Sequence, residues 1–335
     1  MAEEANAVGK RDGAEGDGAP PEVGRTTTGD EALDVLLDAD IDRVMAHLDR
    51  IVEAAPSYRK LISRWERQGW SSEAFDFTRD AEEWNDASIW TAEQKRFMVW
   101  SLSEFFCGEE RVTTELLPFA IAAPTDDQRI FLASQIADEA RHTVFFDRFY
   151  REVVGSDAKT IAANLAEQRG HVNQEWRQLF DGILHDCAEA LRKDPSDFEA
   201  LVRGVTVYMI VIEGTLALTG ARFILRSLKE MDRLPGFREG FTYVNRDESR
   251  HVGFGIRFLS DAIREDPRHK RVVADTIKET LPVGVLAFAP EWVENRYDFT
   301  TPFGYTSGEI FDYAMRSLSK KLAAMGLEPL AAAPA

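Results

Sequence analysis

The stretch Asp138-Glu139-Ala140-Arg141-His142 returns 109 positions later (248 minus 139) as Asp247-Glu248-Ser249-Arg250-His251, so each copy reads Asp-Glu-x-Arg-His. Residues three apart lie on one face of an α-helix, so each copy directs a carboxylate and an imidazole at the same point. A four-helix bundle that holds two metal ions takes one Glu from each of two helices and a Glu-x-x-His from each of the other two. The repeated stretch therefore predicts such a bundle, and two lone glutamates have to be found.

The composition is that of an ordinary folded protein, with 335 residues of which 44% are hydrophobic and 29% charged. A formal net charge of -18 argues against a nucleic-acid partner or binding to an anionic lipid surface. The two cysteines, Cys107 and Cys187, form no Cys-x-x-Cys pair, so we expect free, buried thiols. No apolar run reaches the roughly 18 to 20 residues of a membrane span, and no signal peptide is apparent. We therefore expect a cytoplasmic protein with no membrane span.

The chain divides into a long helical region between two tails. Residues 1–29 contain almost no large apolar side chains and are predicted to be a disordered acidic tail, and 327–335 a flexible Ala/Pro tail. Residues 30–326 are predicted to form a single helical domain, with an irregular strap at 70–84. Strand signals are absent, so the fold is predicted to be all-α, a four-helix bundle core with additional helices. Capping residues, breakers and apolar periodicity predict helices at about 30–55, 57–69, 91–118, 125–154, 160–193 with a break near Gly170, 196–233, 237–263, 268–296 and 307–325.

Glu213 lies in a segment, residues 205–216, whose apolar residues surround the helix on all sides. Such a helix must be buried. A lone buried carboxylate is costly unless it is protonated, paired or bound to a metal. An arginine such as Arg222 or Arg250 could pair with it, but the two Glu-x-x-His pairs make metal ligation the more economical interpretation.

The other lone glutamate must come from the helix at 91–118, which offers Glu104, Glu109, Glu110 and Glu115. Glu109 lies on the apolar face of that helix, while Glu110 is about 100° away. For Glu104, Glu110 and Glu115 we expect a solvated or ion-paired surface position. The apolar face is defined by Met98, Leu102, Phe105, Phe106, Val112 and Leu116.

Four carboxylates and two imidazoles suit iron or manganese better than zinc or magnesium, so the predicted centre is Mn/Fe or Fe/Fe. Four carboxylates also balance the charge of two divalent ions. Asp138 and Asp247 each precede a predicted ligand and could orient a ligand histidine, Asp247 more readily than Asp138. Arg141 and Arg250 fall off the ligand face and could pair with these aspartates or with solvent.

These residues resemble the ribonucleotide reductase small-subunit superfamily, and within it the small-subunit-like ligand-binding oxidases. The resemblance covers about residues 57–265 and implies a ferritin-like bundle. Besides the ligand positions, it rests on Phe75-Asp76-Phe77-Thr78-Arg79-Asp80, Gly108-Glu109-Glu110-x-Val112-Thr113, Val207-Tyr208 and Glu213-Gly214-Thr215-Leu216-Ala217.

Three positions separate the branches of this superfamily. Reductase subunits carry a radical-bearing tyrosine four residues after the first ligand histidine, and this chain has Phe146 there, as some manganese/iron reductases do. The oxidases carry a Val three residues after the first ligand Glu and a Tyr five residues before the third, and this chain has Val112 and Tyr208. In that family a Mn/Fe centre activates O₂ and joins the Val Cβ to the Tyr oxygen, and a long-chain fatty acid binds with its carboxylate at the metals.

The resemblance also implies the distribution of the ligands, with Glu139 bridging the metals. Trp70 would meet Asp247 near the first histidine, and the protein would be a homodimer. Where the family leads us to expect a tyrosine after Leu218-Thr219-Gly220, this chain has Ala221-Arg222, which affects the shape of the ligand pocket. The implied ligand sets are Glu109, Glu139 and His142 for the first metal, and Glu213, Glu248 and His251 for the second.

The predicted function is an O₂-activating dinuclear oxidase that binds a fatty acid-like ligand. One alternative is a radical-generating reductase subunit, which would need a tyrosine in its C-terminal tail, yet none follows Tyr313. A second is an oxygenase of arylamines or other natural products on the same scaffold. The alternative that is not an enzyme is a ferritin-like metal store.

Overall fold

The structure, a computed structural model, describes residues 41–328. Within that range there is no β-strand, only an isolated bridge between Thr300 and Thr306, and the predicted all-α class is confirmed. The tail predicted for 1–29, the first part of the helix at 30–55 and most of the C-terminal tail lie outside the described residues. The helices are α1 (Ile41–Ala54), α2 (Tyr58–Arg67), η2 (Ser72–Ala74), α3 (Thr78–Asn85), α4 (Ala92–Ala122), α5 (Asp126–Phe149), η3 (Tyr150–Val154), α6 (Ile161–Gln168), α7 (Gln174–Arg177), η4 (Gln178–Leu184), α8 (His185–Lys193), α9 (Phe198–Val205), η5 (Thr206–Ala217), α10 (Leu218–Glu230), α11 (Pro235–Glu265), α12 (His269–Ala287) and α13 (Ser307–Ala324).

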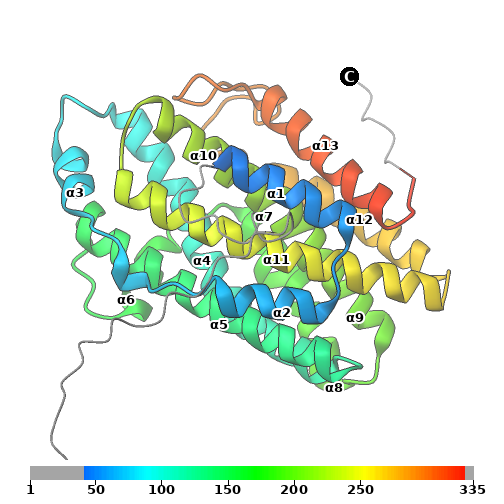
Figure 1. Cartoon of the computed structure of the whole chain (residues 1–335). Coiled ribbons are helices and arrows are strands. Elements are labelled where there is room, and N and C mark those ends of the chain that lie inside the picture. The colour runs from blue at the N-terminus through cyan, green and yellow to red at the C-terminus, as the bar shows by residue number, and fades with distance from the viewer. Residues whose placement is uncertain (1–40, 329–335) are drawn as a thin grey trace, which may run out of the picture.

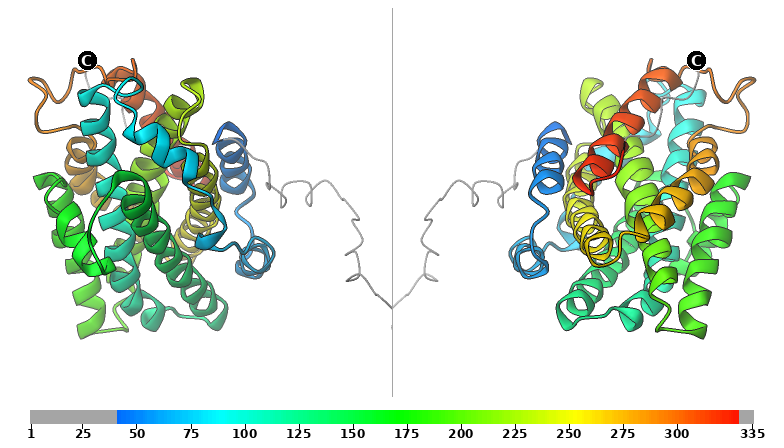
Figure 2. Two further views of the ribbon diagram at one scale, coloured as in Figure 1. Left: turned by 90° about the vertical axis from the view of Figure 1, so that its left-hand side faces the viewer. Right: turned by 90° about the vertical axis from the view of Figure 1, so that its right-hand side faces the viewer.

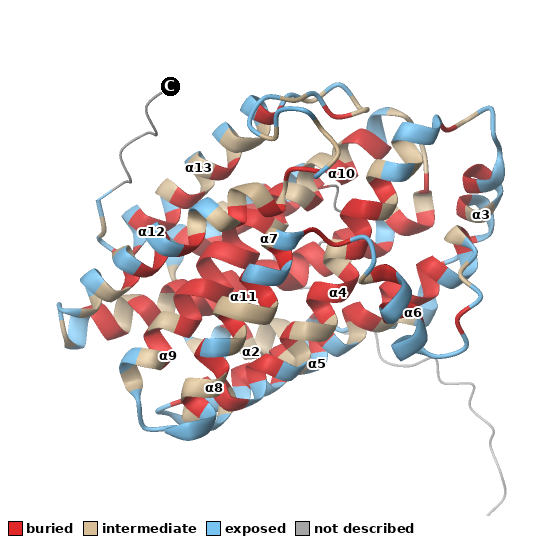
Figure 3. Ribbon diagram, turned by 180° about the vertical axis from the view of Figure 1, so that it is seen from behind, coloured by how far each residue is buried: buried red, intermediate tan, exposed pale blue. Residues whose placement is uncertain are grey.

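Four long helices form the core of the molecule. They are α4, α5, α11 and the continuous helix Phe198–Glu230 that joins α9, η5 and α10. The helix α4 packs along α5, and η5 packs against α11, while the shorter helices lie around this core (Figures 1 and 2). Buried residues concentrate along the facing sides of the long helices (Figure 3). Bundle cores of this kind are where cofactor and metal sites are built from side chains of facing helices.

Two capping boxes fix where the first two long helices begin. The Thr91 side chain accepts a bond from the Gln94 backbone, and the Gln94 side chain binds back to Thr91, so α4 begins where the sequence predicted. Thr125 and Gln128 do the same for α5. Each box satisfies two backbone N–H groups that the first helical turn leaves without partners.

The structure corrects four of the predicted boundaries. α4 continues past Pro118 to Ala122, where the lost hydrogen bond is offset by Phe119, which is fully buried. α12 ends at Ala287 rather than near 296, because Pro290 cannot continue the helix. Arg296 folds back and donates to the Leu286 and Ala289 carbonyls at 2.6 and 2.9 Å. The strap at 70–84 contains η2 and α3, and α9 begins at Phe198, after its N-cap Asp197, rather than at 196.

The helix Phe198–Glu230 is long and apolar enough to cross a membrane, with a mean hydropathy of 1.6 over 18 residues, although the sequence pattern suggested no such segment. In the fold, 89% of that window is buried among the other helices. A helix with apolar residues on every side belongs in a core. The burial predicted for the helix that carries Glu213 is therefore observed.

Candidate metal centre

Six carboxylate and imidazole side chains meet inside the bundle, and all six are buried. They come from each of the four long helices: Glu109 on α4, Glu139 and His142 on α5, Glu213 on η5, and Glu248 and His251 on α11. Their ligand atoms form two groups, in each of which all atoms lie within 4.8 Å of one another: Glu109, Glu139, His142 and Glu248, and Glu139, Glu213, Glu248 and His251. The structure thus brings together all six predicted ligands. Glu248 belongs to both groups, as Glu139 does.

The donor set fits two divalent cations. Burial raises the pKa of Glu109 and of Glu213 well above the ordinary value, and the neighbouring carboxylates raise both further. The second carboxylate oxygen of Glu213, Oε2, is buried and makes no hydrogen bond. Cations bound among these side chains would relieve the repulsion and give this oxygen a partner. Carboxylates combined with imidazoles are ligands that manganese and iron accept.

Each ligand histidine is oriented by an aspartate from the other helix of the repeated pattern. His142 Nε2 lies 3.3 Å from Asp247 Oδ2, and His251 Nε2 lies 3.2 Å from Asp138 Oδ2. The Nδ1 atoms face the carboxylates, at 3.3 Å from Glu139 for His142 and at 3.2 Å for His251. An Nε2–H that donates to an aspartate leaves Nδ1 free to bind a metal. Asp138 and Asp247 therefore occupy equivalent positions, although the sequence favoured Asp247.

Two arginines neutralise this pair of aspartates. Arg250 Nη2 donates to Asp138 at 2.6 Å and its Nη1 to Asp247 at 2.8 Å. Arg141 donates to Asp138 and also to Asp247, the latter at 2.8 Å. Although burial alone would raise it, the pKa of Asp247 is lowered by Arg250, His142 and Arg141. The aspartates therefore stay ionised and keep their hydrogen-bond acceptors directed at the histidines.

Two tryptophans complete the orienting network. Trp70 Nε1 donates to Asp247 at 2.7 Å, and its ring stacks on His142 with centroids 6.0 Å apart. Trp65 on α2 donates to Asp138 at 3.0 Å, which is the equivalent contact on the other side. Trp65 was not predicted from the sequence. No motif marks it, because α2 reaches the aspartate from 73 residues away along the chain.

Gln135 is another site residue that the sequence analysis missed. It is fully buried on α5, and its Nε2 donates to Glu213 Oε1 at 3.0 Å. The same nitrogen lies 3.3 Å from Glu139 Oε1 and 3.4 Å from the Tyr208 hydroxyl oxygen. Gln135 precedes Glu139 by four residues, so it shares the ligand face of α5, and that spacing was the available signal.

A π-helix directs Tyr208 and Glu213 at the same site. The two residues are five apart, which in an α-helix would turn their side chains well away from each other. The segment η5 is a π-helix, in which hydrogen bonds span five residues, so positions five apart fall on one side. Tyr208 Oη donates to Glu139 Oε1 at 2.7 Å, and Thr215 Oγ1 binds the Ile210 carbonyl at 2.7 Å.

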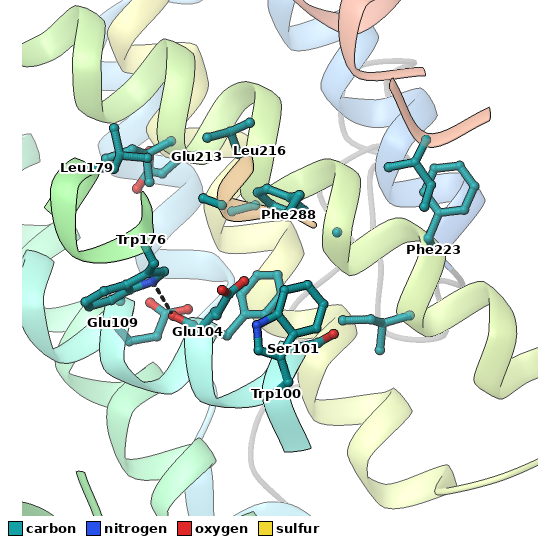
Figure 4. Close-up of a pocket in the computed structure, with 18 of the residues that line it drawn as sticks. Trp100, Ser101, Glu104, Glu109, Trp176, Leu179, Glu213, Leu216, Phe223 and Phe288 are labelled. Atoms are coloured by element: carbon teal, nitrogen blue, oxygen red, sulfur yellow. Dashed lines mark hydrogen bonds between the residues drawn. The ribbon is translucent and has the colours of Figure 1, made fainter. Parts of the chain in front are cut away.

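A cavity extends from the metal ligands between α4 and the η5–α10 helix (Figure 4). Val112 and Tyr208 both line it, beside Glu109, Glu139 and Glu213. The rest of its wall is mainly aromatic and aliphatic and includes Phe105, Trp176, Leu179, Phe180, Leu216, Phe223 and Phe288. A long apolar cavity that ends at a cluster of ligand carboxylates is suited to hold an apolar molecule by one polar end.

Phe146, at the position where reductase subunits carry the radical tyrosine, is fully buried among aromatic rings. Its ring lies 5.5 Å from Phe241 and 6.2 Å from Phe105, measured between centroids. Tyr150, four residues further along the chain, hydrogen bonds with Ser103 at 2.8 Å and not with any of the predicted metal ligands. Tyr208 is therefore the tyrosine that contacts a predicted ligand among the described residues.

The three other glutamates of α4 have different surroundings. Glu110 pairs with Arg169 at 3.4 Å, as expected for a surface position. Glu115 is ion-paired with His185 and Arg192, each at 2.8 Å, but it is buried. The expectation of a surface position is wrong for it, because these partners compensate its desolvation.

For Glu104 the expected surface position is also wrong. Its side chain lines the cavity, and burial raises its pKa well above the ordinary value. No ion pair of Glu104 with a basic side chain is present in the described part of the chain.

The chain has Ala221-Arg222 in place of the expected tyrosine, and neither residue lines the cavity. The cavity wall at this point is formed by Gly220. Arg222 lies over the ring of Tyr313, with its guanidinium carbon 4.6 Å from the centroid, and pairs with Asp42 at 3.3 Å. Its side chain therefore points to α13 and α1 rather than into the cavity.

The fold and the site together define a class, the ferritin-like helical bundles with two adjoining carboxylate–histidine clusters. Residues 54–330 match the family described as ribonucleotide reductase, small chain, and the chain belongs to that family.

Solved structures with this fold include R2-like ligand-binding oxidases. One with an aerobically reconstituted Mn/Fe cofactor is 26% identical, with a TM-score of 0.68 over 80% of this chain and 92% of that one. A variant with an anaerobically reconstituted Mn/Fe cofactor is 25% identical, with a TM-score of 0.68 over 82% and 94%. The oxidase from Sulfolobus acidocaldarius, 22% identical with a TM-score of 0.67 over 81% and 92%, shares the fold. These neighbours support the resemblance to oxidases that the sequence indicated, and the chain is an oxidoreductase.

Proposed function

We propose that this protein is an O₂-activating oxidase with a dinuclear Mn/Fe or Fe/Fe centre. The observation that carries the proposal is that two adjoining ligand groups open onto the same cavity as Val112 and Tyr208. When bound, the metal pair supplies the reduction of O₂ and the oxidising strength to remove hydrogen from a C–H bond. Glu109, Glu139 and His142 would hold one ion, and Glu213, Glu248 and His251 the other.

The chain itself contributes geometry and exclusion of water. The aspartate–arginine–tryptophan network fixes both histidine rings before any metal binds, so the ligands need little reorganisation. The six ligand residues are buried, and the surrounding cavity wall is mainly apolar, which limits competition from water. Glu139 accepts the hydrogen bond of Tyr208 and so holds the phenolic hydroxyl at the ligand cluster.

We further propose that the protein forms an ether bond between Val112 Cβ and Tyr208 Oη. The Cβ–H and O–H bonds break and one C–O bond forms, and the two electrons and two protons released pass to O₂, which is the oxidant. The supporting observations are that both side chains line one cavity and that the Tyr208 hydroxyl is held at Glu139. Burial and the charges of Glu139 and Glu213 raise the pKa of Tyr208 well above its ordinary value, so the hydroxyl is protonated before reaction.

The ligand that we propose is a long-chain fatty acid or a similar molecule. Its carboxylate would lie at the metals, and its chain would follow the apolar cavity between α4 and α10. The burial of a long chain against aromatic and aliphatic walls supplies the binding free energy.

A radical-generating reductase subunit is the alternative that the family match favours. Phe146 and its aromatic neighbours offer no hydroxyl at the position of the radical tyrosine. A stable tyrosyl radical in the loaded protein, with no change of mass, would support this alternative.

The test is the intact mass of the protein after aerobic loading with manganese and iron. We expect the loss of two hydrogen atoms, because the crosslink removes one from each partner. The variant Tyr208→Phe, which lacks the bonding oxygen, should bind metal and keep its full mass. An unchanged mass in the fully loaded wild-type protein would refute the crosslink.

A further inference from the structure

Glu104 is the one acidic side chain of the cavity wall that lies outside the two ligand groups. It precedes Glu109 by five residues on α4, so it lies about 7–8 Å along the helix from that ligand. In Figure 4 its side chain extends toward the cavity beside Trp100 and Trp176, and Trp176 Nε1 donates to its backbone carbonyl at 3.1 Å. The carboxyl group is therefore part of the path that a ligand would follow away from the metals.

Polar atoms at this point of the cavity lack partners. Glu104 Oε1 and Trp100 Nε1 are both buried, and neither has a partner at hydrogen-bond distance, although the indole N–H is close enough to the carboxyl group to lower its pKa. Burial raises the pKa of Glu104 well above its ordinary value, although the Asn173 N–H, Trp100 and Arg296 oppose that change. A neutral carboxyl group can both donate and accept a hydrogen bond, and the indole N–H adds a second donor.

A plain alkyl chain is a poor match for this part of the wall. It would exclude water from Glu104 and Trp100 without replacing the lost hydrogen bonds. A ligand with a hydroxyl group at this depth would accept from one of these groups and donate to the other. Sites built to hydrogen-bond a hydroxyl discriminate strongly against analogues that lack it.

We propose that the cavity binds a long apolar molecule that carries a hydroxyl group partway along its chain, and that Glu104 recognises this hydroxyl with the help of Trp100. The orientation, with the polar end of the molecule at the metal ligands, rests on the proposed function. Recognition by Glu104 requires only that the cavity be occupied. Phe105, Leu216 and Phe288 enclose the remaining chain with apolar surface.

The experiment measures dissociation constants of the metal-loaded full chain by calorimetry. The ligands are hexadecanoic acid, a series of hydroxyhexadecanoic acids with the hydroxyl group near mid-chain, and the hydroxyhexadecanoic acid with the hydroxyl at the terminal carbon. We expect at least one mid-chain isomer to bind about tenfold or more tightly than hexadecanoic acid, which corresponds to 1.4 kcal/mol. The terminal isomer should show no such gain. Equal affinities across the series, or no binding of any of the acids, would overturn the proposal.

Variants of Glu104 test whether this residue causes the preference for a mid-chain hydroxyl group. Glu104→Leu should reverse it, so that hexadecanoic acid binds more tightly than the mid-chain isomers, while Glu104→Gln should retain most of it because an amide also donates and accepts. Glu110→Gln is the matched control, since Glu110 is the half-buried partner of Arg169 and should leave all affinities unchanged. A preference that survives in Glu104→Leu would assign it to another residue and contradict the proposal.

The mass measurement on the same preparations separates this inference from the proposed function. If the loaded wild-type protein keeps its full mass but still binds a mid-chain isomer more tightly, the proposed crosslink is refuted and the recognition by Glu104 stands. If the protein loses two hydrogen atoms but binds no mid-chain isomer more tightly than hexadecanoic acid, the crosslink stands and the recognition by Glu104 is refuted.

Discussion

Lys321 on α13 is a buried lysine that makes no ion pair with a carboxylate among the described residues. Its side chain is 1% exposed, and Nζ donates to the Ser317 hydroxyl at 2.6 Å. Burial lowers its pKa from 10.5 to about 7, which the nearby charge of Asp49 only partly opposes. Its carbon atoms pack against Gly214 of η5, next to the predicted ligand Glu213. A buried amine of this kind costs stability that an apolar side chain of similar length would not.

We expect Lys321→Met to stabilise the protein at pH 7 by on the order of 1–3 kcal/mol. Between pH 7 and 10.5 the unfolded lysine binds a proton that the folded one does not, so wild-type stability rises with pH across this window and falls as pH returns to 7. The advantage of the variant should therefore shrink toward pH 10. Urea unfolding of both proteins at pH 7 and pH 10 measures it.

Lys320→Met is the matched control for this comparison. Lys320 is exposed and pairs with Asp49 at 2.6 Å, so its replacement should change stability by less than about 1 kcal/mol at either pH. An equal gain from both substitutions would mean that burial of Lys321 is not the cause.

Single residues also show what could be predicted from the sequence. Glu139, His142, Glu248 and His251 follow from an i, i+3 spacing, and Glu109 follows from helix phase. The position of Glu104 could not be predicted in this way, because tertiary neighbours such as Asn173 determine whether its face of α4 is exposed or enclosed. Spacing reports which residues share a face and not what covers that face.

Among the elements, η5 depends most on one glycine. A Cβ atom at Gly214 would lie 2.7 Å from the Met209 carbonyl oxygen and 3.0 Å from Lys321 Cε. The carbonyl belongs to the π-helix itself, so it can move only if the hydrogen-bond register changes. The register that directs Tyr208 and Glu213 at one site therefore requires a residue without a side chain here.

We expect Gly214→Ala to destabilise the protein by about 1–3 kcal/mol, as overpacking does, and to lower the number of metal ions bound per chain, because Glu213 is the preceding residue. Thermal unfolding and metal analysis of the same preparation measure the two effects.

Gly182→Ala in η4 is the comparison, since nothing lies within 4 Å of a Cβ there. It should be neutral or stabilising by about 0.4–1 kcal/mol. Full metal content in Gly214→Ala would show that the register does not depend on this glycine.

The elements themselves were largely predictable. Capping boxes gave the starts of α4 and α5, and the break at Pro56 separated α1 from α2. The π-helix was not predicted, because the sequence pattern of a fully apolar helix is the same for either hydrogen-bond register. The end of α12 was missed although Pro290, three residues after Ala287, is a helix stop signal in the sequence.

For the whole molecule, metal binding should be a large part of stability. The metal-free centre holds four buried carboxylates, and ions that bind only the folded state stabilise it by about 2.7 kcal/mol for each site filled at 100 times its Kd. We expect loading to raise the unfolding temperature by about 5–15 °C. Differential scanning calorimetry before and after chelation measures this change.

Glu213→Gln should lose most of this gain, because it removes a charge that belongs to one ligand group. Glu110→Gln, outside both groups, should keep all of it. If Glu213→Gln binds two ions per chain and is stabilised as fully as the wild type, the assignment of Glu213 as a ligand is wrong.

The crossed contacts between Asp138 and His251 and between Asp247 and His142 affect the order of assembly. Each half of the chain supplies three ligands, yet neither half contains the aspartate that orients its own histidine. The centre can therefore form only after α5 and α11 have docked. A nascent chain that has exposed only its first half presents no completed site, so the choice between competing metals falls to the folded protein and the ions available to it.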